Sequence, residues 1–188
     1  TELQASKQRG ATWQLLGQQV LMGKLKLPVL TDQELKLEEA MPEYREILKM
    51  MQLLAPEQLP FNLDAWDGYA VCRDRVYASL AEHGVNPVVL AGDTHNAWSS
   101  NLYSKDGAFV GVELATSSVS SPGLEKYLNI PLAQLQQFEF AFKTLIDELN
   151  YCNLNQRGYL VVEFDQLQVQ SKWIFVDSIM QANYSIDE

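Results

Sequence analysis

The chain of 188 residues contains 47% hydrophobic and 20% charged residues, enough to bury a core in one or two domains. Acidic residues number 24 against 14 basic ones, and this excess, with Lys and Arg scattered along the chain, argues against nucleic-acid binding through the phosphates. No apolar stretch approaches the roughly 18 residues of a membrane span, and an anionic ligand would need local positive charge, which a bound metal ion can supply.

The first predicted element is a strand. A polar segment, 6–12, leads into the largely apolar residues 13–22, which contain Gly17. A glycine inside a strand predicts a bulge or a close approach of another backbone segment.

A helical region follows a loop that contains Pro28. Residues 31–34 have the pattern of a capping box, which opens a helix. Pro42 interrupts this region, so we expect two short helices or a break, and we interpret residues 31–54 as a helical insertion at the surface. Apolar residues at helical spacing occur in it at Leu35, Tyr44, Ile47, Leu48 and Met51.

The middle of the chain predicts a helix followed by a buried strand. Residues 60–69 combine turn residues with aromatic ones, and a helix is expected over 69–82. His83-Gly84 is typical of a helix C-terminus, and residues 88–91 form a short apolar strand. The predicted buried side of the helix contains Val71, Val76, Tyr77 and Leu80.

The last part of the chain predicts further strands and one long helix. Residues 105–107 indicate a hairpin between strands at 100–103 and 108–115. A hydroxyl-rich loop at 116–123 precedes a helix over 132–149, which follows Pro131. The chain ends in a predicted strand pair, 158–164 and 168–176. The order of elements is that of a mixed α/β fold, with no internal repeat and no low-complexity tract.

The cysteines and the start of the chain leave alternatives open. Cys72 and Cys152 form no CxxC motif, and one disulfide and two buried free thiols are both compatible with the sequence. Residues 1–4 have neither the charged nor the apolar region of a signal peptide. Because the chain begins without a methionine, we expect that it is processed or cut from a longer polypeptide.

Gly92-Asp93-Thr94-His95 follows the buried strand, at the end where open α/β sheets carry their chemistry. Carboxylate oxygen and imidazole nitrogen are both metal ligands, and the glycine permits a sharp turn. His95 is one of only two histidines. The alternative is that Asp93 caps a turn and His95 has a structural role. Asn96 is either a supporting group beside the ligands or a turn residue.

Other polar residues have simpler interpretations. Asp67 is at the position expected for a helix N-cap, and His83 is better explained as a C-terminal helix residue than as a ligand. Asp64, which with Asp67 flanks Trp66, could bind a cation or orient a histidine, and its role stays open. The serines of 116–123 lack a Gly-x-Ser-x-Gly elbow and are expected to hydrogen-bond to backbone near the site. The sequence has no Walker loop and no dinucleotide-binding motif.

Five sequence blocks, in this order and across nearly the whole chain, resemble the PhoD-type alkaline phosphatases: 13–20, 62–69, 88–98, 116–123 and 157–159. The resemblance implies a calcineurin-like metallophosphoesterase, whose fold is a four-layer α-β-β-α sandwich with a metal centre at the strand ends. This chain would form the C-terminal half, with a mixed sheet and flanking helices. Such enzymes hydrolyse phosphate mono- and diesters with metal ions that hold the phosphate and activate water.

The resemblance also assigns roles to residues. The last metal-binding block of the superfamily usually reads Gly-His-x-His, and its positions match Asp93 and His95; an aspartate at the first of them is a feature of the PhoD-type branch. The resemblance thus implies that His95 and Asp93 are catalytic metal ligands, that Asn96 and Asp64 support them, and that the metals are iron and calcium. It further implies a periplasmic or secreted bacterial protein, with a cytoplasmic one as the alternative.

One departure from the family limits these assignments. The earlier metal-binding blocks, such as Gly-Asp-x-x-Asp, do not occur in this sequence. We therefore expect that the 188 residues are inactive alone, need the missing N-terminal half as a partner, and can form a homo-oligomer through an exposed apolar sheet face. The alternative is a non-catalytic module in which Asp93 and His95 make structural hydrogen bonds. A self-sufficient mononuclear hydrolase is disfavoured because it needs three protein ligands.

Overall fold

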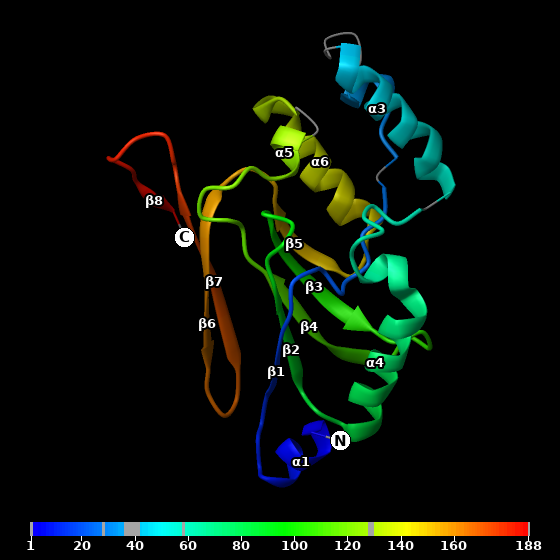
Figure 1. Cartoon of the computed structure of the whole chain (residues 1–188), viewed down its shortest axis with the longest axis vertical. Coiled ribbons are helices and arrows are strands. Elements are labelled where there is room, and N and C mark those ends of the chain that lie inside the picture. Colours follow the sequence, from blue (N-terminus) through cyan, green and yellow to red (C-terminus); the bar gives the residue numbers. More distant parts are fainter. Residues whose placement is uncertain (1, 28, 36–41, 58, 128–129, 188) are drawn as a thin grey trace.

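The computed structural model describes residues 2–27, 29–35, 42–57, 59–127 and 130–187. The helices and the strands β1–β5 of one sheet are interspersed along the chain, and the strands of a second sheet follow at its C-terminal end (Figure 1). The helices are α1 (Glu2–Gln8), α2 (Asp32–Leu35), α3 (Pro42–Leu54), η1 (Ala55–Glu57), η2 (Trp66–Tyr69), α4 (Ala70–His83), α5 (Leu124–Tyr127) and α6 (Leu132–Leu145). The strands are β1 (Gln14–Gly17), β2 (Pro87–Ala91), β3 (Ala97–Tyr103), β4 (Phe109–Ala115), β5 (Leu149–Asn153), β6 (Arg157–Phe164), β7 (Val169–Val176) and β8 (Ile186–Asp187).

The main sheet is mixed and has the strand order β1-β2-β4-β3-β5. Strands β1, β2 and β4 are parallel to one another, whereas β3 runs antiparallel to both β4 and β5. A separate antiparallel sheet has the order β6-β7-β8. The predicted mixed α/β class with flanking helices is therefore confirmed, and so is the hairpin at 105–107.

One face of the main sheet is covered by helices. Side chains alternate between the two faces of a sheet, and paired residues lie on the same face. The strand register therefore puts Val89, Trp98 and Leu102 on one face. Tyr77 and Leu80 of α4 are buried in one apolar cluster with Val89 and Leu102. The helix thus covers the part of the sheet formed by β2, β4 and β3, where Val110 of β4 joins the same cluster.

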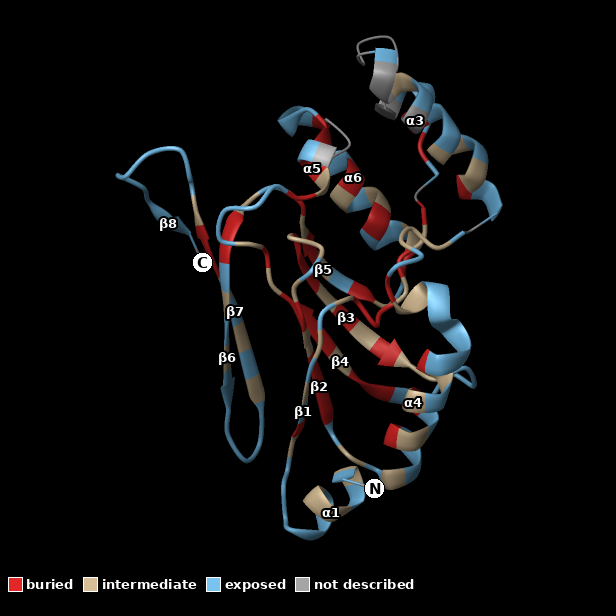
Figure 2. Ribbon diagram, viewed as in Figure 1, coloured by how far each residue is buried: buried red, intermediate tan, exposed pale blue. Residues whose placement is uncertain are grey.

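A second apolar cluster lies between α6 and the same face. Phe142 of α6 contacts Trp98 edge to face, with ring centroids 5.7 Å apart, and Phe61 in the same way at 5.6 Å. Phe138 of α6 is also buried in this cluster, as is Cys152 of β5. Figure 2 shows the buried residues concentrated along the strands and on the helix sides that point toward them.

The opposite face of the sheet is covered less completely. Leu15 of β1 is 55% exposed, and Leu90 and Val112 on the neighbouring strands are half-buried. The β6–β7 ribbon lies on this side (Figure 1), where Trp173 donates an indole hydrogen bond to the carbonyl of Ala115 at 2.9 Å. The ribbon therefore contacts this face near one end and leaves part of its apolar surface accessible.

Two predicted element boundaries are wrong. The strand predicted over 13–22 covers only β1, because the chain turns away after Gly17. No atom of the described residues lies within 4 Å of a Cβ built at Gly17, so nothing is packed against the side-chain position of this glycine. The helix predicted to reach residue 149 ends at Leu145, and β5 begins at Leu149. Pairing with β3 and burial of Leu149 and Cys152 outweigh the local helical pattern there.

The helix α4 also differs from its prediction in detail. The 3-10 helix η2 precedes it, and Val71, expected on the buried side, is 75% exposed. Arg73, which is 4% exposed, is buried instead. The stop at residues 83–84 is confirmed, because Gly84 closes the helix with φ 55°. The polar N-terminal segment, for which no element was expected, contributes α1.

Two helices occupy the region 31–54, as Pro42 predicts. The chain between them, 36–41, and the side chains of Leu35, Tyr44 and Ile47 lie outside the described residues. Leu48 of α3 is 5% exposed and belongs to the core cluster beneath α6. The interpretation of 31–54 as an insertion stays a prediction.

The two cysteines are free thiols. Cys72 lies exposed on α4 and Cys152 is buried in β5, so the alternative of a disulfide between them is wrong. Burial raises the pKa of the Cys152 thiol to about 12. Among the described helices, none has the length and apolar character to cross a membrane.

Two glycines in strands should respond differently to substitution. A Cβ at Gly158 would lie 1.9 Å from the carbonyl oxygen of Ile174, whereas a Cβ at Gly17 would meet no described atom within 4 Å. We expect Gly158→Ala to lower the free energy of unfolding by about 1–3 kcal/mol, because the β6–β7 pairing must shift. Gly17→Ala should change it by less than about 1 kcal/mol. Urea unfolding monitored by circular dichroism measures both, and equal values for the two variants would contradict this account.

Candidate functional site

Residues 92–96 form a tight loop directly after β2. The backbone N–H groups of Gly92 and Asp93 both donate to the carbonyl of Gln19, at 3.1 and 3.0 Å, and His95 N–H donates to the Gly92 carbonyl at 3.1 Å. These bonds fix the loop at the carboxyl ends of the parallel strands β1, β2 and β4. The predicted position of the Gly-Asp-Thr-His block at the end of a buried strand is thus confirmed.

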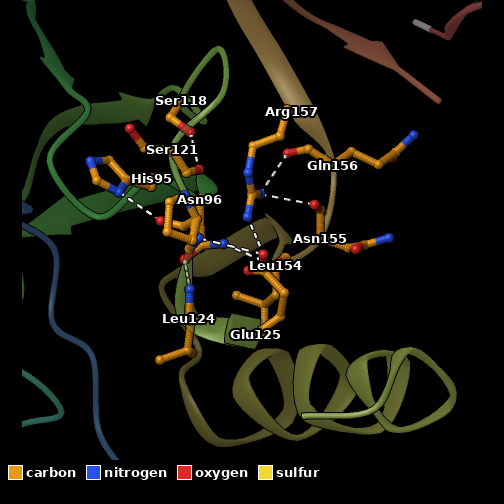
Figure 3. Close-up of polar contacts among 12 residues, drawn as sticks. His95, Asn96, Ser118, Ser121, Leu124, Glu125, Leu154, Asn155, Gln156 and Arg157 are labelled. Atoms are coloured by element: carbon orange, nitrogen blue, oxygen red, sulfur yellow. Dashed lines mark hydrogen bonds and ion pairs between the residues drawn. The ribbon is translucent and has the colours of Figure 1, made fainter. Parts of the chain in front are cut away.

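His95 is held in an unusual backbone conformation. Its φ of 59° is the only positive value for a non-glycine residue in the described part of the chain. Its ring Nδ1 lies 2.8 Å from the carbonyl oxygen of Pro122 (Figure 3). Because a carbonyl can only accept, Nδ1 carries the hydrogen, and in the neutral ring Nε2 keeps its lone pair for another partner. This is the tautomer that binds a metal through Nε2.

Asn96 connects the loop to two other segments. Its side chain is 1% exposed, and its Nδ2 donates to the carbonyl of Leu154 at 2.9 Å while its Oδ1 accepts from the N–H of Leu124 at 3.1 Å. Both ends of the amide are therefore engaged (Figure 3). Gly123 permits this packing, because a Cβ there would lie 2.5 Å from Asn96 Nδ2.

A buried ion pair supports the segment that contacts His95. Glu125 and Arg157 form a salt bridge, with both side chains 7% exposed. Arg157 also donates to the carbonyls of Asn155 and Gln156, at 2.8 and 3.2 Å. The pair ties β6 to the turn that contains Pro122, and removal of one partner of such a pair typically costs about 3–5 kcal/mol.

A second buried polar group lies under the segment 22–25. Glu113 of β4 is 1% exposed, and its carboxylate accepts the N–H groups of Met22 at 2.7 Å and Gly23 at 2.9 Å. Desolvation raises the pKa of Glu113 from 4.5 to about 7, against the smaller opposing effects of these bonds and of the Arg73 charge. Burial also raises the pKa of Tyr77, whose hydroxyl donates to the Met22 carbonyl at 2.9 Å.

The prediction that Asp67 caps a helix is wrong. Asp67 lies inside η2, and α4 has no side-chain N-cap bond. Its carboxylate forms a buried ion pair with Arg73 and accepts the N–H of Leu25 at 2.8 Å. The Asp67 carboxylate bonds to this segment because the irregular residues 22–25 have backbone N–H groups that no strand satisfies.

A cavity of about 220 Å³ opens beside the loop. Asp93, Thr94, His95 and Asn96 line one side of it, and Asp67, Asn62 and Gly23 are also in its wall. The rest of the wall is apolar: Leu21, Leu25, Phe61, Ala65, Trp98 and Leu124. The structure therefore brings the two predicted ligands, Asp93 and His95, to the edge of one cavity.

The other predicted residues lie elsewhere. Asp64 is exposed and is not part of the cavity wall; its N–H donates to Asn62 Oδ1 at 2.9 Å. His83 ends α4, and the carbonyl of this residue accepts from Lys7 at 3.0 Å. In the hydroxyl-rich loop, Ser118 Oγ donates to the Ser121 carbonyl at 2.5 Å, a side chain to backbone bond of the kind expected.

The described residues do not form a complete metal site. Nowhere among them do three His, Cys, Asp or Glu side chains gather in a group that could hold an ion. Asp93 and His95 have the donor atoms and the position for one, but a protein site generally needs at least three ligands. The chain therefore offers a partial ligand set.

Sequence reasoning did not find the buried groups behind the site: Arg73, Glu113, Glu125 and Arg157. Charged residues inside predicted helices and strands are ordinarily assigned to solvent. The available signal for Glu113 was its position in the apolar strand 108–115. Arg157 was noted only within the sequence block 157–159.

Comparisons with known proteins identify a family for this chain. The family model described as PhoD-like phosphatase matches residues 1–173. Alkaline phosphatase D of Bacillus subtilis (strain 168) is 35% identical over 68 residues, which are 34% of this chain and 12% of that protein. The solved "Structure of PhoD" superposes with a TM-score of 0.67 at 19% identity, over 98% of this chain and 29% of that one, and so supports the fold. The chain spans less than a third of that structure.

The raised pKa of Glu113 predicts how stability depends on pH. Between pH 4.5 and 7 the folded chain keeps the Glu113 proton that the unfolded chain has released, so the free energy of unfolding should fall as pH rises through this window, by about 3 kcal/mol, and level off above it. Urea unfolding at a series of pH values measures this slope. In Glu113→Gln this fall in the free energy of unfolding should be absent. In the control Glu163→Gln, at an exposed site in β6, it should remain. Parallel curves for the wild type and Glu113→Gln would refute the assignment.

Proposed function

Because this chain belongs to the PhoD-like phosphatase family, we propose that it is part of a metal-dependent hydrolase of phosphate mono- and diesters. The observation that carries the proposal is the fixed orientation of His95, whose Nδ1 is bound to the Pro122 carbonyl at 2.8 Å, which leaves Nε2, without a partner among the described residues, to bind a metal. Asp93 lies on the same loop, exposed to incoming ligands.

In this proposal His95 and Asp93 are metal ligands, and the ions, iron and calcium by resemblance, would hold the phosphate and activate water when bound. The residues of the chain do the positioning. Asn96 fixes the loop through its two hydrogen bonds, and Pro122 fixes the tautomer of His95. Asp64 would have to act from outside the cavity wall, so we give it no direct contact with the substrate.

The remaining ligands would come from the other part of a longer polypeptide. Two candidate ligands cannot complete a metal centre, and the chain spans 29% of the solved structure that it matches. We propose accordingly that the 188 residues are inactive alone. An extracytoplasmic location of the longer protein is part of the same proposal and rests on family resemblance.

The same longer polypeptide explains the exposed sheet face. Leu15, Leu90 and Val112 form an apolar surface on the side of the sheet away from α4 and α6. In a four-layer sandwich the second sheet packs on this surface. We propose that the missing half covers it, and that in its absence a second copy of the chain does so.

A non-catalytic module is the second candidate. The hydrogen bond from His95 to Pro122 and the loop bonds to Gln19 are structural contacts that such a module would also need. Metal content separates the two functions, because a module binds none even when the rest of the polypeptide is present.

The first test is metal content and turnover in two samples, this chain and the longer polypeptide. We expect bound metal and nitrophenol release from a nitrophenyl phosphodiester only in the longer protein. His95→Ala should lower its rate by at least about 100-fold, because a ligand is lost. His83→Ala, which changes the other histidine at the end of α4, should leave the rate unchanged. Metal-stimulated turnover by the short chain above its own His95→Ala control would contradict the proposal of missing ligands.

The second test concerns association. We expect the isolated chain to sediment as a dimer or larger species at high concentration, because its open sheet face is apolar. Leu15→Lys should shift it toward monomer. Leu167→Lys is the matched control, since Leu167 is 91% exposed in the turn between β6 and β7. A wild-type chain that stays monomeric in sedimentation equilibrium would rule out self-association through this face.

A further inference from the structure

We propose that the cavity beside residues 92–96 binds the alcohol part of the substrate, and that this part is an apolar ring. The inference rests on the proposed function, since it assigns the phosphate to the ions that Asp93 and His95 would hold and the ester's alcohol to the adjoining cavity. It names a substrate class, phosphate esters of aryl or similar ring-bearing alcohols.

The chemistry of the wall favours such a group. Six apolar side chains contribute to it, from four different segments of the chain: Leu21, Leu25, Phe61, Ala65, Trp98 and Leu124. A sugar or glycerol hydroxyl placed among them would lose its hydrogen bonds to water without replacement, at a cost of about 1–3 kcal/mol per group. An aromatic ring loses nothing of this kind and removes apolar surface from water.

Apart from Asp93 and His95, most polar side chains in the wall already have partners, whereas Asn62 is engaged only through its Oδ1 in the described part of the chain. Asp67, the buried carboxylate there, is paired with Arg73 and accepts the Leu25 N–H. Thr94 Oγ1 accepts the indole N–H of Trp98 at 3.0 Å. The amide of Asn96 is bonded at both ends. The cavity thus presents little unused hydrogen-bonding capacity toward a ligand on this side.

The cavity has the size and rigidity for one ring. Its volume of about 220 Å³ exceeds the roughly 150 Å³ of an engineered apolar cavity that accepts benzene. Phe61 and Trp98 are both held edge to face by Phe142. A preformed wall reduces the entropy that binding must overcome.

The position of the loop sets the direction of the substrate. Asp93 and His95 line the same cavity as the apolar side chains, so a phosphate on ions that these two residues would hold has the apolar wall beside its alcohol group. An ester bond then lies at the boundary between the polar loop and the apolar cavity. This arrangement discriminates among esters by their alcohol and not by their phosphate.

The experiment uses phenol as the probe and the indole N–H signals of the ¹⁵N-labelled chain as the readout. The chain has four tryptophans, and of these Trp98 lines the cavity. We expect phenol to shift the Trp98 signal with a Kd on the order of 1 mM, and to leave the signals of Trp13 and Trp173 in place. Glycerol at the same concentrations should shift none of them. Equal shifts of all the indole signals, or no shift of the Trp98 signal, would overturn the proposal from measurements on the wild-type chain alone.

A matched pair of variants tests the cavity itself. Ala65→Leu adds a larger side chain in the wall and should weaken phenol binding at least tenfold. Ala141→Leu makes the same change in a separate groove on α6 and should leave phenol binding unaltered. Thermal unfolding checks that both variants fold. Unchanged phenol affinity in a folded Ala65→Leu chain would overturn the assignment.

The longer polypeptide separates failure of this inference from failure of the proposed function. We expect a lower KM for phenyl phosphate esters than for glyceryl ones, with Ala65→Leu raising the former about tenfold. Hydrolysis with equal KM values would overturn the cavity assignment alone. Phenol binding without any hydrolysis would overturn the proposed function and the substrate role with it. Phenol binding by the short chain but not by the longer protein would mean that the missing half fills the cavity, which also overturns the proposal.

Discussion

The structure of the site depends on the buried carboxamide of Asn96. One side chain satisfies a backbone carbonyl after β5 and a backbone N–H at the start of α5, at Leu154 and Leu124. It thereby fixes three chain segments that are remote in sequence. An unpaired donor or acceptor at this depth would cost about 1–3 kcal/mol, so the three segments are held in one arrangement. His95, the preceding residue, takes its left-handed conformation within this arrangement, and its ring reaches the carbonyl of Pro122.

Two buried acidic residues support the same region from different sides. Glu113 accepts backbone N–H groups from the segment that follows β1, and Glu125 pairs with Arg157 behind the turn that contacts His95. A buried carboxylate is costly unless hydrogen bonds or a cation compensate for it. Irregular backbone near a strand end, conversely, has donors that no sheet satisfies. Each of the two carboxylates therefore gains the hydrogen bonds that compensate for its burial, and the donors it accepts from hold a loop beside the cavity.

The sequence predicted the position of the Gly-Asp-Thr-His loop better than the contacts around it, and the reason is physical. A glycine, a carboxylate and an imidazole after an apolar strand form a local pattern, and the structure has that loop at the end of β2. The hairpin at 105–107 is equally local. The errors all involve contacts between remote segments. β5 exists because β3 is available to pair with it, and Asp67 binds Arg73 and Leu25 instead of capping a helix. Arg73 is buried, whereas helical spacing predicts that Val71 lies on the buried side of α4. No periodicity encodes these partners.

Four of the five sequence blocks that resemble the PhoD-type phosphatases are connected around the loop 92–96, although they are spread along the chain. Gln19 binds the loop of Asp93 and His95, and the turn with Pro122 accepts the ring of His95. Arg157 holds that turn through Glu125. Segments that meet at one cavity edge serve a common geometry. The strand β2 adds a second argument, because its apolar residues point to both faces of the sheet and only one face is covered by α4 and α6. A strand of this composition is suited to burial on both sides, which favours the proposal that a second layer of a longer polypeptide covers the open sheet face.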